Sequence, residues 1–199
     1  MDNFHYISSD IFSLENLQEI VTQNKSLALS EEAIINIEKC RAYLDKKMAL
    51  HKEPIYGINT GFGSLCNVKI SDENLSQLQE NLVKSHACGT GDEAPQEIVK
   101  LMLLLKIQSL SYGHSGVQLQ TVERLIAFYN NDIFPVIYTQ GSLGASGDLA
   151  PLAHLSLPLL GEGEVYFEGK KGHGSVIMRD FNWDPIVLQS KEGLAVLNG

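Results

Sequence analysis

The segment GSLGASGDLAPL, at residues 141–152, gathers small residues around a single serine. Because Ala145 and the flanking glycines carry almost no side chain, the backbone at Ser146 has little steric protection. Three interpretations fit this composition: a plain loop without a chemical role, a cradle of backbone N–H groups that binds an anion, and a backbone that itself reacts. These residues alone leave all three alternatives open.

The reactive backbone makes the most use of the residue types. If the Gly147 nitrogen attacks the Ala145 carbonyl carbon and water leaves, a five-membered ring forms. Loss of the Ser146 hydroxyl as a second water then leaves an exocyclic methylidene group, which is a strong electrophile. Glycine at 147 keeps the attacking nitrogen unhindered and permits an unusual backbone conformation. Asp148 can assist the proton transfers. An anion cradle is a weaker match, because the segment has neither the lysine of a phosphate-binding loop nor the glycine spacing of a dinucleotide-binding loop.

Two further segments combine glycine with polar side chains that a packed core does not need. YGINTGFGSL, at residues 56–65, predicts an irregular loop, and Tyr56 on such a loop could act as a general base. NLVKSHACGTG, at residues 81–91, places His86 at the end of an amphipathic helix. Taken singly, each has a simpler structural interpretation, with the Tyr56 ring packed in a turn and His86 an ordinary helix-end histidine.

The elements that position these segments are predicted to be mainly helical. Polar residues followed by apolar residues at helical spacing predict helices that begin after Ser13, Ser30 and Ser71. A helix with apolar residues on most faces follows Pro95, which predicts burial in a helix bundle or an oligomer interface.

Two more helices are predicted, one at residues 117–129 and one in the apolar run capped by Asp148, where Pro158 must kink or end the helix. In that run His154 is interpreted as a buried, hydrogen-bonded residue, and Trp183 further on as a packing anchor.

Strand signals are few and short. Residues 54–58 and 135–138 are candidate strands, and EVYFEGKKGHGSVI predicts a hairpin that turns at residues 169–172. The predicted fold class is therefore mainly α with small β accessories.

Composition limits the class of protein. The 199 residues are 44% hydrophobic and 20% charged, which suits one compact domain or part of a larger one. The net charge of −9 argues against nucleic-acid and anionic membrane partners, which need basic patches.

Three widely spaced cysteines without a CxxC pair argue against a disulfide framework or a structural zinc site and favour the cytoplasm. Neither a secretory signal nor a bilayer-spanning segment is visible. The apolar ending KEGLAVLNG suggests the front portion of a longer polypeptide.

Four segments together resemble a known family. YGINTGFG, LQENLVKSHACGTG, GSLGASGDLAPLAHL and EGLAVLNG occur in the order and approximate spacing of the N-terminal part of the histidine/phenylalanine/tyrosine ammonia-lyase family. The resemblance covers nearly the whole chain from about residue 14, and the third segment is the most specific. It implies that residues 1–199 are a single N-terminal domain of the L-aspartase/fumarase-like helical lyase fold, mainly α with small β-hairpin accessories.

The resemblance also implies a prosthetic group. In this family Ala-Ser-Gly cyclises autocatalytically to a methylidene-imidazolone (MIO), here from Ala145, Ser146 and Gly147, so that no metal and no diffusible cofactor is expected. The implied roles are Tyr56 as the base that removes the β-proton, His86 as a contact to the substrate ring, and Asn198 close to the MIO and the bound amino acid. The supporting positions are Gly63, Gly144 and Asp148.

The implied reaction is elimination of ammonia from L-histidine to give trans-urocanate, by a full-length homotetramer whose active sites are built from more than one subunit. Ser85-His86 and GDLAPLAHL favour histidine as the substrate. A tyrosine or phenylalanine ammonia-lyase and an aminomutase carry the same front-end motifs and are the alternatives.

Two alternatives come from other functional classes. Family members are much longer than this chain, and their C-terminal helices supply the tetramer core and further active-site residues. A chain that stops at Gly199 could therefore be a non-catalytic binding or assembly module in which MIO need not form. The other alternative is a phosphate-binding loop protein, which predicts nucleotide binding by residues 144–148 and no cyclisation.

Overall fold

The computed structural model describes residues 3–50, 53–61, 68 and 70–198, and Gly63 lies outside these described residues. The α-helices are α1 (Leu14–Thr22), α2 (Glu31–Leu50), α3 (Leu75–His86), α4 (Gln96–Ser111), α5 (Leu119–Asn130), α6 (Ala150–Ser156), α7 (Gly174–Asp180) and α8 (Glu192–Leu197). The 3₁₀ turns are η2 (Asp72–Asn74) and η3 (Leu157–Leu160). The strands are β1 (Phe4–Ile7), β2 (Ser26–Leu29), β3 (Thr90–Glu93), β4 (Phe134–Pro135), β5 (Tyr138–Gln140), β6 (Glu164–Phe167) and β7 (Lys170–His173). The prediction of a mainly α fold is confirmed.

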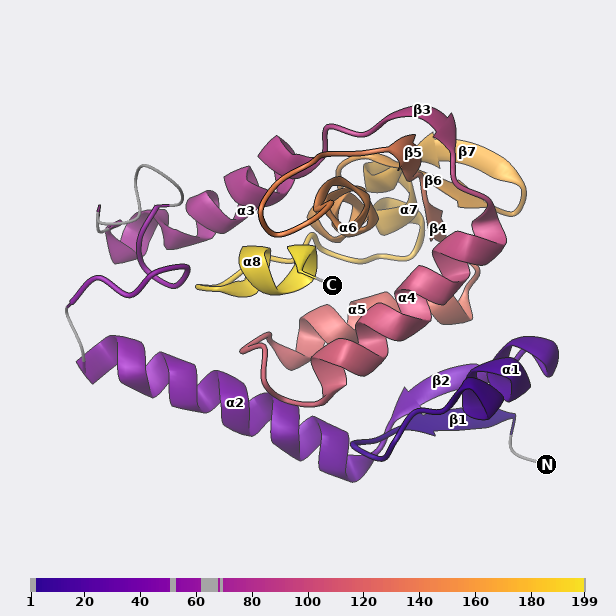
Figure 1. The fold of residues 1–199 in the computed structure, drawn as a ribbon, viewed down its shortest axis with the longest axis horizontal. Helices are drawn as coiled ribbons and strands as arrows, with labels where there is room; N and C mark the ends of the chain where they lie inside the picture. Colours follow the sequence, from indigo (N-terminus) through magenta and orange to yellow (C-terminus); the bar gives the residue numbers. More distant parts are fainter. Residues whose placement is uncertain (1–2, 51–52, 62–67, 69, 199) are drawn as a thin grey trace.

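Figure 1 shows how the elements are arranged. The parallel pair β1–β2, helix α1 and the long helix α2 form the lower part of the view, α4 and α5 cross the middle, and α3, α6, α7 and α8 lie above them. The small sheets β3–β5 and β4–β6–β7 lie beside α6 and α7 at the upper right. The residues between β5 and α6, which include the glycine-rich segment, form a long loop in front of α6.

Helices α4 and α5 pack along each other and supply much of the core. Leu103, Leu104 and Ile107 of α4 are completely buried, as are Val122 and Leu125 of α5. Burying an aliphatic side chain of this size contributes about 1.5–3 kcal/mol. The predicted burial of the helix after Pro95 is therefore confirmed.

The predicted starts of the first two helices are confirmed by their caps. The Ser13 hydroxyl accepts a hydrogen bond from the backbone N–H of Asn16 at 3.2 Å, and the Asn16 side chain accepts one from the backbone N–H of Ser13 at 3.1 Å. The Ser30 hydroxyl accepts from the backbone N–H of Ala33 at 3.1 Å. Each bond satisfies an N–H group that the first turn of a helix leaves without a partner.

The predicted strand at residues 54–58 is wrong. The backbone N–H groups of Ile58 and Asn59 both donate to the Ile55 carbonyl at 3.1 Å, which makes this segment a turn. The physical reason is Gly57, whose φ of +72° lies in the left-handed region and breaks an extended chain. The strand predicted at 135–138 is divided between β4 and β5.

The predicted hairpin is present as β6 and β7, but its turn lies earlier than expected. The turn residues are Glu168 and Gly169, with φ of +49° and +72°, which is the geometry of a tight two-residue hairpin turn. Lys170 and Lys171 consequently belong to β7, where Lys171 pairs with Glu93 at 2.7 Å.

Pro158 ends an α-helix as predicted, because α6 stops at Ser156 and the chain continues as the 3₁₀ turn η3. The helix expected after Ser71 begins at Leu75, preceded by η2. Within the described residues, no helix combines the length and the apolar character needed to cross a bilayer.

Candidate active site

The glycine-rich loop has a tight turn at its tip. The Gly147 N–H donates to the Gly144 carbonyl at 3.1 Å, so that Ala145 and Ser146 are the central residues of a β-turn. The φ of Gly147 is +85°, and a Cβ atom built there would meet nothing within 4 Å. Glycine is therefore required by backbone conformation and not by crowding. All four residues are exposed, so the backbone that could cyclise is folded back on itself and uncovered.

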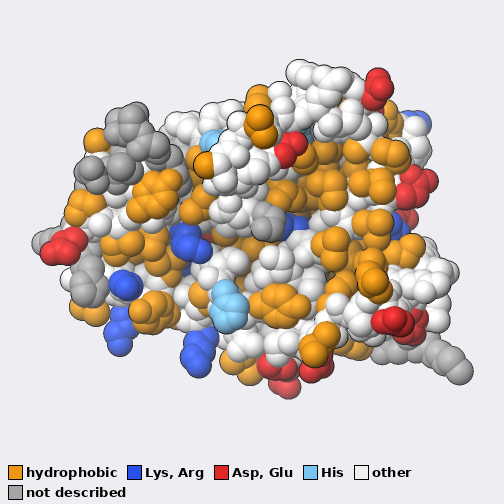
Figure 2. Space-filling view, viewed as in Figure 1, with side chains coloured by type: hydrophobic (Ala, Val, Ile, Leu, Met, Phe, Trp, Pro, Cys, Tyr) orange, Lys and Arg blue, Asp and Glu red, His pale blue; other side chains and the backbone are white. Residues whose placement is uncertain are grey.

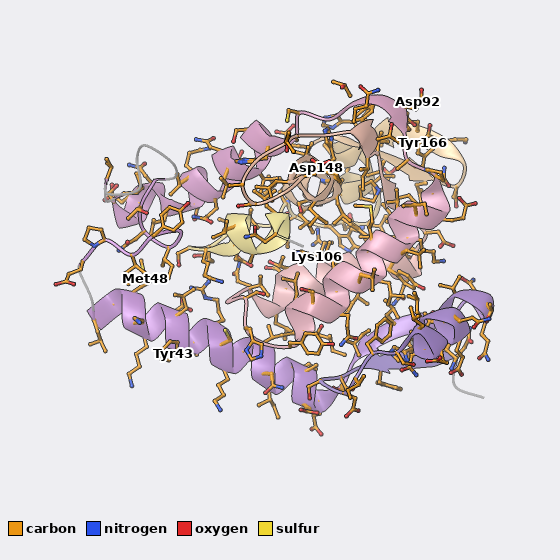
Figure 3. The ribbon with its side chains drawn as sticks, in the orientation of Figure 1. Tyr43, Met48, Asp92, Lys106, Asp148 and Tyr166 are labelled. Atoms are coloured by element: carbon orange, nitrogen blue, oxygen red, sulfur yellow. The ribbon has the colours of Figure 1, made fainter. Side chains whose placement is uncertain are left out.

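Asp148 fixes the base of this loop. Its Oδ1 accepts hydrogen bonds from the backbone N–H groups of Ser142 at 2.7 Å and Ala150 at 3.2 Å. A Cβ atom at Gly141 would lie 2.1 Å from the Asp148 carboxylate oxygens, so a side chain there would displace this carboxylate. Figure 3 labels Asp148 where the loop passes in front of α6. Its carboxylate uses N–H groups that a bound anion would need, which argues against the anion cradle.

The expected cap at Asp148 is shifted by one residue. Helix α6 begins at Ala150, and Leu149 occupies the cap position. The Asp148 side chain still accepts a hydrogen bond from the N–H of the first helical residue. Asp148 therefore marks the start of α6 although it lies two residues before it.

His86 is the last residue of α3, as predicted. Its Nδ1 lies 2.8 Å from the carbonyl oxygen of Leu82. A carbonyl can only accept, so Nδ1 carries the proton in this bond and Nε2 is the acceptor nitrogen of the neutral ring. The bond fixes the ring at the helix end.

His154 is hydrogen-bonded, as predicted, although it is only partly buried, and its partners come from distant segments that the sequence did not indicate. Its Nε2 accepts a hydrogen bond from the backbone N–H of Gly89 at 3.0 Å, and its ring stands edge-on to Tyr138 with centroids 5.1 Å apart. Burial lowers the pKa of His154, which keeps the ring neutral and able to accept. Tyr138 precedes the glycine-rich loop, His154 follows it, and Gly89 follows His86. One imidazole thus connects both ends of the loop with the segment after His86.

Asn198 directly follows α8, and its Nδ2 donates to the Leu194 carbonyl at 3.0 Å. The start of α8 is held by Glu192, which is completely buried. The Glu192 carboxylate accepts from the backbone N–H of Gln118 at 2.8 Å and from the Thr121 hydroxyl at 2.7 Å. These donors lie at the beginning of α5, so Glu192 satisfies that helix end from a distant part of the chain.

Gly193 brings α8 against α3. Its N–H donates to Oε1 of Gln79 at 2.9 Å, and a Cβ atom built on it would lie 2.7 Å from the Gln79 backbone oxygen. Helices α3, α6 and α8 each contact the other two. The helices that carry His86, the glycine-rich loop and Asn198 therefore form one cluster, the α3–α6–α8 cluster (Figure 1).

Tyr56 is not part of this cluster. It lies in the segment between α2 and α3, which runs at the left of Figure 1. Its side chain is 61% exposed, so the ring is not buried in the core. Its turn is held instead by the buried Asn59, which accepts from the Ile55 N–H at 2.6 Å and donates to the Glu53 carbonyl at 3.0 Å. Within this chain, the turn holds Tyr56 at the surface.

Comparison with solved structures shows which known enzymes share this fold. The chain superposes on histidine ammonia-lyase from Trypanosoma cruzi with a TM-score of 0.87 and 33% identity, over 98% of this chain and 37% of that one. It superposes on tyrosine aminomutase from Streptomyces globisporus with a TM-score of 0.88 and 30% identity, over 98% of this chain and 36% of that one. The fold is thus the mainly helical one that these two enzymes contain.

Sequence comparison gives the family. Residues 12–199 match the family described as aromatic amino acid lyase. The chain is 49% identical to the histidine ammonia-lyase of Legionella pneumophila (strain Corby) over 187 residues, which is 94% of this chain and 37% of that protein. The chain belongs to the aromatic amino acid lyase family. It spans about 37% of the length of this relative. The resemblance inferred from the four segments is confirmed.

Proposed function

We propose that this chain is the single, electrophile-bearing N-terminal domain, residues 1–199, of a cytoplasmic ammonia-lyase that converts L-histidine to trans-urocanate and ammonia. The observation that carries the proposal is the exposed turn at residues 144–147, with its left-handed glycine. The 49% identity to a histidine ammonia-lyase supports histidine as the substrate.

The residues of the loop fit an MIO group. Ala145 is exposed, a Cβ atom at Gly147 would meet nothing within 4 Å, Ser146 supplies the hydroxyl that must leave, and Asp148 anchors the loop base without covering the turn. Once formed, the MIO supplies an electrophile to a substrate whose amine is a poor leaving group. It requires no metal and no diffusible cofactor.

The chain's own side chains bind the substrate and move its proton. Tyr56 accepts the weakly acidic β-proton, His86 contacts the substrate ring, and Asn198 orients the amino acid. Tyr56 belongs to none of the helices of the α3–α6–α8 cluster, and we assign each active site to more than one subunit of a homotetramer.

The second candidate is an aminomutase, which returns ammonia to the β-carbon. The structural similarity to a tyrosine aminomutase favours it, at the lower identity of 30%. The two candidates differ in product, because only the aminomutase yields a β-amino acid.

The test combines intact mass with product analysis of the full-length enzyme, meaning a polypeptide of the family's length that contains these 199 residues. We expect a mass deficit of two water molecules within the peptide that contains Ala145 to Gly147, and urocanate from L-histidine. Ser146→Ala has no hydroxyl to eliminate, so it should lose both the full deficit and the activity.

Tyr56→Phe separates formation of the group from its use. This variant should keep the mass deficit and lose about 10²–10⁴-fold in kcat, the usual contribution of general base catalysis. An active enzyme with unmodified mass would contradict the cyclisation, and a β-amino acid product would replace the lyase by the aminomutase.

A further inference from the structure

Lys106 is a buried lysine in the middle of α4, and only 4% of its surface is exposed. Its Nζ donates to the Ala195 carbonyl at 2.7 Å and to the Asn198 carbonyl. Among the described residues, no carboxylate lies within ion-pair distance of this ammonium. Figure 3 shows Lys106 in the space between α4 and α8. Its partners are therefore backbone oxygens at the C-terminal end of the helix that precedes Asn198.

A charge in this place has an energetic cost. Removing an ammonium from water costs several kcal/mol unless close partners compensate, and burial lowers the pKa of Lys106 to about 8. The compensation comes from the end of α8, where the last carbonyls have no partner within the helix and carry the negative end of its dipole. An apolar residue of similar length would fill the same space without this cost. Stability alone therefore does not explain a lysine here.

The contact lies at a point where the chain needs support. Helix α8 has 6 residues, too few for a helix to be stable on its own. Glu192 and Gly193 hold its first turn, against α5 and α3. Lys106 holds its last turn, and one of the two carbonyls that it binds belongs to Asn198 itself.

We propose that Lys106 is a positioning residue, whose ammonium fixes the main chain at Asn198 so that the Asn198 side chain meets the substrate. The inference rests on the proposed function, in which Asn198 contacts the amino acid. Lys106 acts through Asn198 and needs no contact with the substrate.

The test is a double-mutant cycle on the full-length enzyme. Lys106→Met preserves length and removes the charge, so the α8 end loses its two hydrogen bonds. We expect kcat for histidine to fall about 10–100-fold, the effect of a small misplacement of a substrate-contacting group. The mass deficit of two waters should remain. In an Asn198→Ala background, Lys106→Met should have little further effect, because residues that act through one another are not additive.

Two control variants accompany Lys106→Met. Lys106→Arg keeps a charged donor and should recover most of the activity. Lys100→Met removes a lysine of the same helix that pairs at the surface with Asp132 at 2.6 Å, and it should leave kcat unchanged. If Lys106→Met does not fold, Lys106→Gln, which keeps a donor without the charge, replaces it in the cycle.

The proposal is overturned if loss of the ammonium leaves kcat unchanged, or if it lowers kcat equally with and without the Asn198 side chain. An enzyme inactive on histidine would instead contradict the proposed function. Hydrogen exchange tests Lys106 without substrate: the Asn198 amide, which donates to the Leu194 carbonyl at 3.2 Å, should exchange faster in Lys106→Met. Unchanged exchange at this amide would also overturn the proposal.

Discussion

His154 accepts the backbone N–H of Gly89 through Nε2, a bond that only the neutral imidazole can make. His86 and Asp148 are likewise held through backbone groups, Leu82 for the imidazole and Ser142 for the carboxylate. At the scale of single residues, the main chain therefore orients the side chains around the glycine-rich loop, and protonation of His154 removes one of these supports.

This dependence predicts a loss of stability in acid. Burial lowers the pKa of His154, so below the ordinary value of about 6.5 the unfolded chain binds a proton that the folded chain does not. The free energy of unfolding therefore falls as the pH falls through this range. We expect the urea midpoint to decrease between about pH 7 and about pH 5, and to decrease less in His154→Gln. His5, whose pKa burial also lowers, is present in both proteins and cancels in the comparison. An equal decrease in both would contradict a role for His154.

At the scale of elements, α8 has little stability of its own and is held by its neighbours. Glu192 joins it to α5, Gly193 joins it to α3, and Lys106 joins it to α4. The α3–α6–α8 cluster therefore depends on close approach of the backbones at Gly193, where the Gln79 oxygen leaves no space for a side chain.

Gly193→Ala should consequently destabilise the protein by about 1–3 kcal/mol, the usual cost of adding a methyl group to a filled site. Gly172→Ala is the matched control, because a Cβ atom there meets nothing within 4 Å. Its effect should lie within about 0.5 kcal/mol. Urea unfolding of the two variants measures the difference, and equal stabilities would show that α3 and α8 can separate without cost.

At the scale of the whole molecule, apolar side chains reach the surface on the face shown in Figure 2, with most of the acidic side chains towards its rim. Leu143, in the glycine-rich loop, is completely exposed, and the side chains of Ile11, Leu14 and Leu50 are largely exposed. Exposed apolar residues in such numbers are typical of surfaces that contact another chain.

We therefore expect the 199-residue chain by itself to associate. Gel filtration should give a species larger than a monomer at high protein concentration, and dilution should shift it to a smaller one. The full-length enzyme, measured alongside, should elute as a homotetramer. A chain that stays monomeric at every concentration would show that these apolar side chains do not form an interface in this domain.

Features that depend on near neighbours can be predicted from the sequence alone. The caps at Ser13 and Ser30 and the break at Pro158 involve residues a few positions apart, so they can be predicted without a fold. The reactive composition of residues 144–147 and the four family segments were also evident, because they are patterns of residue type. The hairpin turn was predicted too late in the chain. Composition alone does not show whether the two lysines after Gly169 belong to the turn or to the following strand.

The contacts that hold the site together come from long-range packing. Gly193 and Gln79 are 114 residues apart, and Lys106 and Asn198 are 92 apart. No local pattern marks such pairs, and α8 is too short to give a clear helical period. The same applies to Tyr56: bonds within residues 53–59 hold the turn that carries it, but the packing of the whole chain sets where this turn stands. The residue types specify the chemistry that is possible, and long-range packing fixes the backbone positions at which these residues stand.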